Sequence, residues 1–483
     1  MAGKGDQSDA DSAIHASRRT RMTQPESSTA AAKPTRAPIA APPRVGPRAI
    51  LRLAIPAFLA LVVEPLFLLA DSAIIGHLGT PQLAGLGVAG SILTTAVGLF
   101  IFLAYGTTAV VARQLGAGHR AQATQAGLDA LWLSALIGAL AGIALIAWAD
   151  PLCATYGTSP ATHGYAVTYL RIAALAVPSM LVILALTGAL RGVQDTRTPL
   201  IAAVCGFGAN IALNVALVYG FGWGVAGSAW GSVIAQTGMA MGLSLVVIRH
   251  ARHAGARLRP HPLGVLRAAR SGIPLLVRTL ALRATLLLSV WVAAGLGEVP
   301  LAGYQVSATV WTFLAFALDA LAIAAQALTG HTLGAGDIDA ARALTALMAR
   351  WGLLAGAILG GLVALTSPFL PALFTTDPAV RAALALGLLV VGLAQPISGY
   401  AFLLDGVLIG AGDTRWLAWA QSALFLIYLP FAWAVHANGD ALRAAGDGVA
   451  LAALWLAFTA FMLARALLLR WRSRGRAWLV TGA

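Results

Sequence analysis

A few acidic and amide side chains stand inside long apolar stretches, where their types and spacing could bind a cation. Asp71 lies between apolar pairs, and Glu64 precedes it by seven residues, or two helical turns on one face. Asn210 and Asn214 are four residues apart and also share a helix face. Because an ionised carboxylate is costly in hydrocarbon, Asp71 is expected to take up and release a proton at physiological pH. The two amides could hydrogen-bond this carboxyl or water, or join helices only, and Glu64 could simply lie at an interface.

A second group of charges occupies apolar stretches in the other half of the chain. It comprises Arg278, Arg283, Asp319 and Asp405. Buried arginines need partners, and two aspartates supply a balanced set, so mutual neutralisation is one interpretation. The alternative is that an aspartate titrates or meets a cationic substrate in a cleft. Gln326 could line the same cleft or serve only in packing.

The elements that must position these side chains follow from composition. Of 483 residues, 59% are hydrophobic and 10% charged, against about 25% charged in soluble domains. This excludes an ordinary soluble protein. The net charge of +14 does not indicate nucleic-acid binding, because the arginines stand between apolar blocks. We expect an all-α integral membrane protein of twelve transmembrane helices, over residues 51–76, 87–112, 125–149, 165–190, 199–220, 225–248, 269–296, 305–330, 345–371, 382–408, 416–435 and 448–470.

Arginine placement predicts the orientation of these helices. Short loops rich in Arg stay cytoplasmic, and alternate connections hold most of them, including Arg120, Arg257 and Arg342. A multi-pass protein of the cytoplasmic membrane with both termini cytoplasmic is therefore expected. The expected parts are a disordered basic cytoplasmic tail over 1–49, a six-helix lobe over 50–250, a basic linker over 251–268, a second lobe over 269–470 and a tail over 471–483.

The two halves are copies of one another. At an offset of 218 residues, GTPQLAGLGVAG from Gly79 aligns with GEVPLAGYQVSA from Gly297, and QLGAG at 114–118 aligns with TLGAG at 332–336. Six helices per copy is an even number, so the repeats are parallel in the membrane. Two parallel bundles leave a cleft between them and can rock to give alternating access, which is typical of transporters.

Other chemistries leave no trace in the sequence. It contains no GxxxxGK[ST] for ATP and no HExxH, and Cys153 and Cys205 have no metal-ligand spacing. We expect no metal, no cofactor and no enzyme activity. The partners expected are a small organic substrate and membrane lipid, with no nucleic acid, for a chain that works as a monomer.

Five tracts of the sequence carry a resemblance to a known family: EPLFLLADSAIIGHLGTPQLAGLGVAG at 64–90, RQLGAG at 113–118, LRGVQDTRTP at 190–199, GANIALNVALVYGFGWGVAGSAWGS at 208–232 and LDGVLIGAGDTR at 404–415. They resemble the multidrug and toxic compound extrusion (MATE) transporters, within their DinF-like branch. The resemblance implies twelve helices in two lobes and export of organic, often cationic, compounds in exchange for protons or sodium. In that family an Asp at the place of Asp71 is the central cation-coupling residue. The archaeal DinF pattern has Asp where this chain has Asn214, which removes one expected carboxylate.

The prediction is a proton-coupled exporter of organic, cationic or amphipathic compounds, with Asp71 as the coupling residue. Three alternatives stay open at this point. They are a sodium-coupled exporter of the same family, a flippase for lipid-linked oligosaccharides from the wider superfamily, and an integral-membrane enzyme that modifies lipid.

Overall fold

The computed structural model describes residues 46–482, and within them it contains twelve helices long and apolar enough to cross a membrane. The predicted all-α fold is confirmed. The first half comprises α1 (Pro47–Gly76), α2 (Thr80–Gly98) running into α3 (Phe102–Gly116), α4 (Arg120–Ala147), α6 (Pro160–Ala173) running into α7 (Val177–Gly192), α8 (Arg197–Val215) and α9 (Gly224–His253). The second half comprises α10 (Pro262–Gly295), α11 (Glu298–Gly334), α12 (Ile338–Thr366), α13 (Pro378–Gly410), α14 (Thr414–Ala437) and α16 (Asp447–Arg474).

Most helices extend beyond the stretches predicted from hydropathy, because polar turns continue them past the apolar segment. The predicted disordered tail over 1–49 falls mainly on residues 1–45, which lie outside the described residues. Its last three residues, 47–49, belong instead to α1, which begins at Pro47. Similarly, α9 and α10 extend into the predicted linker and leave only 254–261 as a connection. Two short helices, α5 (Ala149–Ala154) and α15 (Gly439–Ala444), lie between longer ones.

The repeat seen in the sequence recurs as repeated helix contacts. Gly188 of α7 lies against the carbonyl of Ala104 in α3, so closely that a Cβ would overlap that oxygen. Gly406 of α13 lies in the same way against the carbonyl of Ala322 in α11. Both members of the second pair are 218 residues beyond the first. Small residues let membrane helices approach this closely, and the two halves use the same positions to do so.

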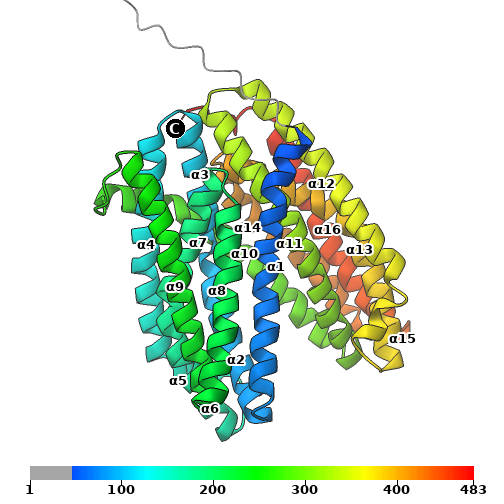
Figure 1. Ribbon diagram of the computed structural model, residues 1–483. Helices are drawn as coiled ribbons and strands as arrows, with labels where there is room; N and C mark the ends of the chain where they lie inside the picture. The colour runs from blue at the N-terminus through cyan, green and yellow to red at the C-terminus, as the bar shows by residue number, and fades with distance from the viewer. Residues whose placement is uncertain (1–45, 483) are drawn as a thin grey trace, which may run out of the picture. The chain divides into compact units, whose positions relative to one another are not determined.

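Two long helices connect the halves in matching ways. The helix α1 packs on α8 of its own half and on α11 of the other, while α10 packs on α14 and on α3 and α4 (Figure 1). Near their C-terminal ends, α3 and α11 cross. Gly116 lies against the backbone of His331, and Gly334 lies against the backbone of Arg113. These pairs exchange under the same offset of 218, so a pseudo-two-fold axis passes through the crossing.

The C-terminal segment packs against this crossing. The Arg113 guanidinium donates hydrogen bonds to the carbonyls of Ala411 at 2.5 Å, Val480 at 2.7 Å and Gly482 at 2.9 Å. Trp478 of the same segment is only 1% exposed. The two halves are therefore held together at this end by α3, α13 and the last residues of the chain.

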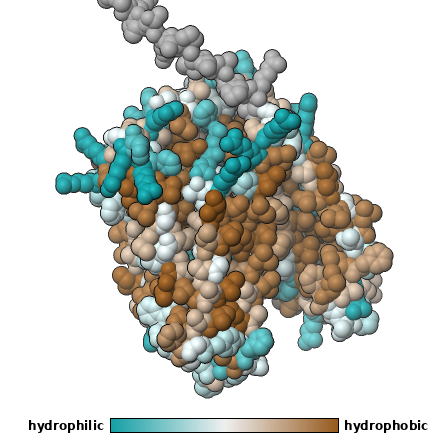
Figure 2. Space-filling model, in the orientation of Figure 1, coloured by the Kyte–Doolittle hydropathy of each residue, from teal (hydrophilic) through white to brown (hydrophobic). Residues whose placement is uncertain are grey.

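The surface matches a membrane environment. Figure 2 shows apolar side chains over the middle of the visible face, with hydrophilic ones gathered mainly toward one end. Large apolar residues such as Leu69, Leu287 and Leu365 are more than 65% exposed. Arginines of the predicted cytoplasmic connections, including Arg120 and Arg257, are exposed, and their end is called the arginine-rich end below.

Candidate functional site

Four helices of the first half converge on Asp71. Its side chain is 2% exposed and accepts three hydrogen bonds. The donors are Asn214 Nδ2 of α8 at 2.8 Å, Ser228 Oγ of α9 at 2.6 Å and Tyr169 Oη of α6 at 3.3 Å. The arrangement satisfies a buried carboxylate with neutral donors and places no basic side chain in hydrogen-bonding contact with it.

The local sequence makes room for this cluster. Gly231 of α9 lies so close to Asn214 Oδ1 that a Cβ would overlap it. Directly after Asn214, the helix widens into a π-helical turn over Ala216–Gly220, a feature that often marks functional sites. The amide of Asn214 is thereby held between α1 and α9.

Two amide oxygens in the cluster stay free. Asn214 Oδ1 and Asn210 Oδ1 are buried, and neither has a hydrogen-bond partner among the described residues. Asn210 donates its own hydrogen bond to Ser232 Oγ at 3.1 Å and does not contact Asp71. Of the two amides singled out in the sequence, only Asn214 therefore bonds the carboxyl. Carboxylate, amide and hydroxyl oxygens together could hold a proton or a hard cation.

Glu64 does not join this cluster. Its side chain is exposed and forms no hydrogen bond within the described part of the chain. The seven-residue spacing correctly places Glu64 two helical turns from Asp71 along α1. Although α6, α8 and α9 each supply a donor to Asp71, none of these donors reaches Glu64.

Ser228 and Tyr169 were missed by the sequence reasoning. Serine and tyrosine are common in membrane helices, and these two belong to helices far from Asp71 along the chain. No spacing rule relates them to the carboxyl; only the packing of α9 against α1, and of α6 against α9, brings them to it.

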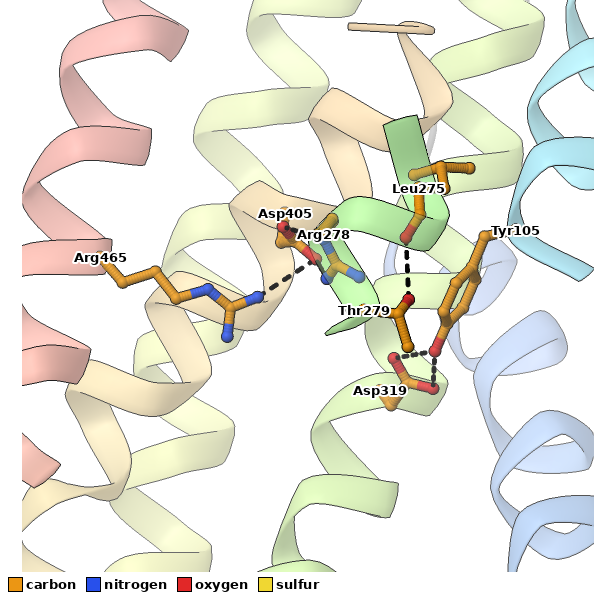
Figure 3. A network of polar contacts seen from close by, with 7 residues as sticks. All are labelled: Tyr105, Leu275, Arg278, Thr279, Asp319, Asp405 and Arg465. Carbon is orange, nitrogen blue, oxygen red and sulfur yellow. Dashed lines mark hydrogen bonds and ion pairs between the residues drawn. The ribbon is translucent and has the colours of Figure 1, made fainter. Parts of the chain in front are cut away.

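Asp405 is the centre of a buried ion-pair cluster in the second half (Figure 3). Arg278 donates from Nε at 3.3 Å and pairs again through Nη2. Arg465 of α16 reaches the same carboxylate at 3.3 Å. The prediction that Arg283 belongs to this set of paired charges is wrong, because Arg283 is exposed and lies beside Gly98 of α2. Arg465 was overlooked because it lies in the last helix, close to the basic tail.

Asp319 bridges the halves instead of pairing with an arginine. Tyr105 Oη of α3 donates to its two oxygens at 3.0 and 3.3 Å (Figure 3). Gln326, also on α11, donates to the Tyr105 carbonyl at 2.5 Å. Arg191 of α7 is 8% exposed and forms no ion pair within residues 46–482. The charges predicted as one balanced set therefore divide into a cluster around Asp405 and a contact between halves at Asp319.

Comparison with known proteins agrees with this architecture. The MatE family model matches residues 56–216 and 274–434, which are again 218 residues apart. The DNA damage-inducible protein F of Escherichia coli is 30% identical over 443 residues, covering 89% of this chain and 93% of that protein. Protein DETOXIFICATION 44, chloroplastic, of Arabidopsis thaliana is 30% identical over 439 residues, covering 88% and 81%. A crystal structure of MATE in the bent conformation superposes with a TM-score of 0.80 at 20% identity, covering 88% and 94%.

Proposed function

Because the chain belongs to the MATE family, in its DinF-like branch, we propose that it exports small organic compounds in exchange for protons. Membership makes the protein a multi-pass membrane transporter and not an enzyme, so the lipid-modifying alternative is wrong. A multidrug resistance protein of Pseudomonas aeruginosa, PmpM, is a further relative at 26% identity over 377 residues. A cationic or amphipathic substrate is the corresponding proposal for this chain.

The observation that carries proton coupling is the environment of Asp71. As a carboxylate it accepts three hydrogen bonds from neutral donors. As a carboxylic acid it has to donate one, and the free Asn214 Oδ1 is an acceptor on a side chain that already contacts it. The same cluster can thus satisfy both protonation states, which is what a reversible proton site requires.

Contacts between the halves support alternating access. The Tyr105 hydroxyl bonds Asp319, and Gln326 bonds the Tyr105 carbonyl. Arg113 adds its hydrogen bonds to Ala411 and the C-terminal segment. All of them have to break for the halves to separate at the arginine-rich end. By the positive-inside rule this end is cytoplasmic, so the proposal places both termini there and the chain as a monomer in the cytoplasmic membrane.

Sodium coupling is a second candidate, favoured by one observation. Asp71, Ser228 and the free Asn214 Oδ1 gather oxygens of the kind that hard cations bind. Proton coupling is preferred because a sodium site needs several oxygen ligands, whereas the hydrogen bonds around Asp71 already suit a proton. The flippase alternative differs in its substrate, a lipid-linked oligosaccharide, and is therefore tested by comparing substrates.

The test is flux in proteoliposomes with the two ion gradients imposed separately. Purified full-length chain is reconstituted, and uptake of a panel of fluorescent organic cations, ethidium among them, is followed. Uptake driven by a pH gradient without sodium is expected. Uptake that requires a sodium gradient would overturn proton coupling, and uptake of a fluorescent lipid-linked oligosaccharide alone would favour the flippase.

A further inference from the structure

A cavity of about 850 Å³ lies at the arginine-rich end between α3, α4 and the first turns of α10. Its lining changes with depth. Arg257, Arg259 and Arg267, from the connection between the halves and the start of α10, line the mouth. Phe102 of α3 and Leu133 of α4 line the far end. The cavity therefore has a basic entrance and a mainly apolar interior, into which Thr107 and Ser271 bring hydroxyl groups.

The depth of the cavity matches one membrane leaflet. Along α3 its lining runs from Gln114 near the helix end to Phe102. Twelve residues of α-helix correspond to about 18 Å, whereas half the hydrocarbon of a bilayer is about 15 Å. The interior thus extends from the headgroup level to about the bilayer midplane.

The positive charge at the mouth is not neutralised by the protein. None of the three arginines forms an ion pair among the described residues. The one acid in the lining is Asp129, which accepts a hydrogen bond from Gln125 at 3.0 Å. Its other oxygen lies against Gly264 in the first turn of α10, where the positive end of the helix faces it. Asp129 is thus held by α4 and α10.

We propose that this cavity binds one anionic phospholipid from the leaflet at the arginine-rich end. The phosphate would lie among Arg257, Arg259 and Arg267, since basic pockets between membrane helices bind such headgroups. An acyl chain would follow α3 toward Phe102. The apolar interior favours a lipid over a free phosphate, which would leave that surface empty. Because α3 and α4 belong to one half and α10 to the other, the lipid contacts both halves and stabilises their present arrangement.

Native mass spectrometry of the full chain tests this proposal. The protein is released from nanodiscs that mix phosphatidylglycerol and phosphatidylcholine with identical acyl chains. One retained phosphatidylglycerol per chain is expected. The triple variant R257Q/R259Q/R267Q is expected to lower its retention about tenfold or more, whereas the triple Lys variant, which keeps the charge, should retain it.

Two further variants separate a built site from general surface attraction. R249Q/R252Q/R342Q also removes three positive charges, but from exposed positions outside the cavity lining, and this variant should retain the lipid. Gly106→Leu fills the cavity interior without changing the charge, so this variant should lose the bound lipid. The backbone should tolerate the substitution, since a Cβ there meets only Leu275 at 3.6 Å.

Three outcomes would overturn the proposal. The first is equal loss in both glutamine triples, which indicates attraction to the basic surface alone. The second is equal retention of phosphatidylcholine. The third is displacement of the bound lipid by millimolar inorganic phosphate, which indicates a site for the free anion.

Discussion

Replacing Asp71 with asparagine removes the proposed proton carrier while keeping the size of the side chain. The new amide can accept the hydrogen bonds of Asn214 and Ser228 through its oxygen, but its NH₂ group then takes the place of the oxygen to which Tyr169 donates. One buried polar group left without a partner costs about 1–3 kcal/mol. The variant should therefore fold with a modest loss of stability, measurable by thermal unfolding in detergent.

The effect on coupling is larger and follows from the number of titratable carboxyls. Asp71 is the one carboxylate in its cluster, so this site carries one proton per cycle. One pH unit is worth about 1.4 kcal/mol per proton, a tenfold concentration ratio. Exchange of one proton for a monovalent organic cation moves no net charge, so the membrane potential does not alter that ratio. Wild-type vesicles are expected to reach about tenfold accumulation, and Asp71→Asn vesicles a ratio near one.

The assay uses proteoliposomes whose lumen is one pH unit more acidic than the medium, with ethidium outside as the probe. Asp150→Asn is the matched control, because Asp150 is also an acid of the first half but bonds His163 and lies outside both the cluster and the cavity lining. It should accumulate the probe as the wild type does. Tenfold accumulation by folded Asp71→Asn protein would refute the assignment of the proton to Asp71.

Three further outcomes follow from other contacts. Asp405→Asn leaves Arg278 and Arg465 as two buried cations without the carboxylate they share, so the free energy of unfolding should fall by about 3 kcal/mol or more, checked by denaturant titration. Arg113→Gln frees the C-terminal segment, so trypsin should cleave after Arg476 faster than in the wild type; an unchanged rate contradicts the contact. Gly116→Leu places a side chain against the α11 backbone. It should lower the fraction of molecules in which α3 and α11 are in contact at the arginine-rich end, measured by labelling a cysteine introduced at that end.

Much of the fold could be predicted because the lipid bilayer restricts which structures can span it. Hydrocarbon requires long uninterrupted apolar helices, so twelve of them were visible from hydropathy, and the offset of 218 related the halves before any contact was known. The helix ends could not be placed as well. The start of α10 at Pro262 lies in a stretch rich in arginine, where neither apolar length nor periodicity indicates a membrane helix.

The candidate site was predictable only along single helices. Asp71 and Asn214 stood out because polar groups in apolar segments are rare, and they do meet. Partners on separate helices followed no such rule: Asp405 pairs with Arg465, and Asp319 with Tyr105 of the other half. Charge balance alone suggested Arg283, whereas the geometry of α10 directs Arg278 inward and leaves Arg283 exposed.

The crossing of α3 and α11 has the form of an isologous interface within one chain. In a symmetric dimer, the same patch of each subunit contacts its copy on the partner. Here Gly116 of the first half contacts the second half, and its equivalent Gly334 contacts the first half in the same way. A substitution at either glycine therefore acts on both copies, which ties these two positions together. Asp71 and its equivalent Ser289 bond residues of their own halves and carry no such mutual constraint. Duplication thus left the chain free to make its two halves chemically different while the glycine contacts at this crossing stayed the same.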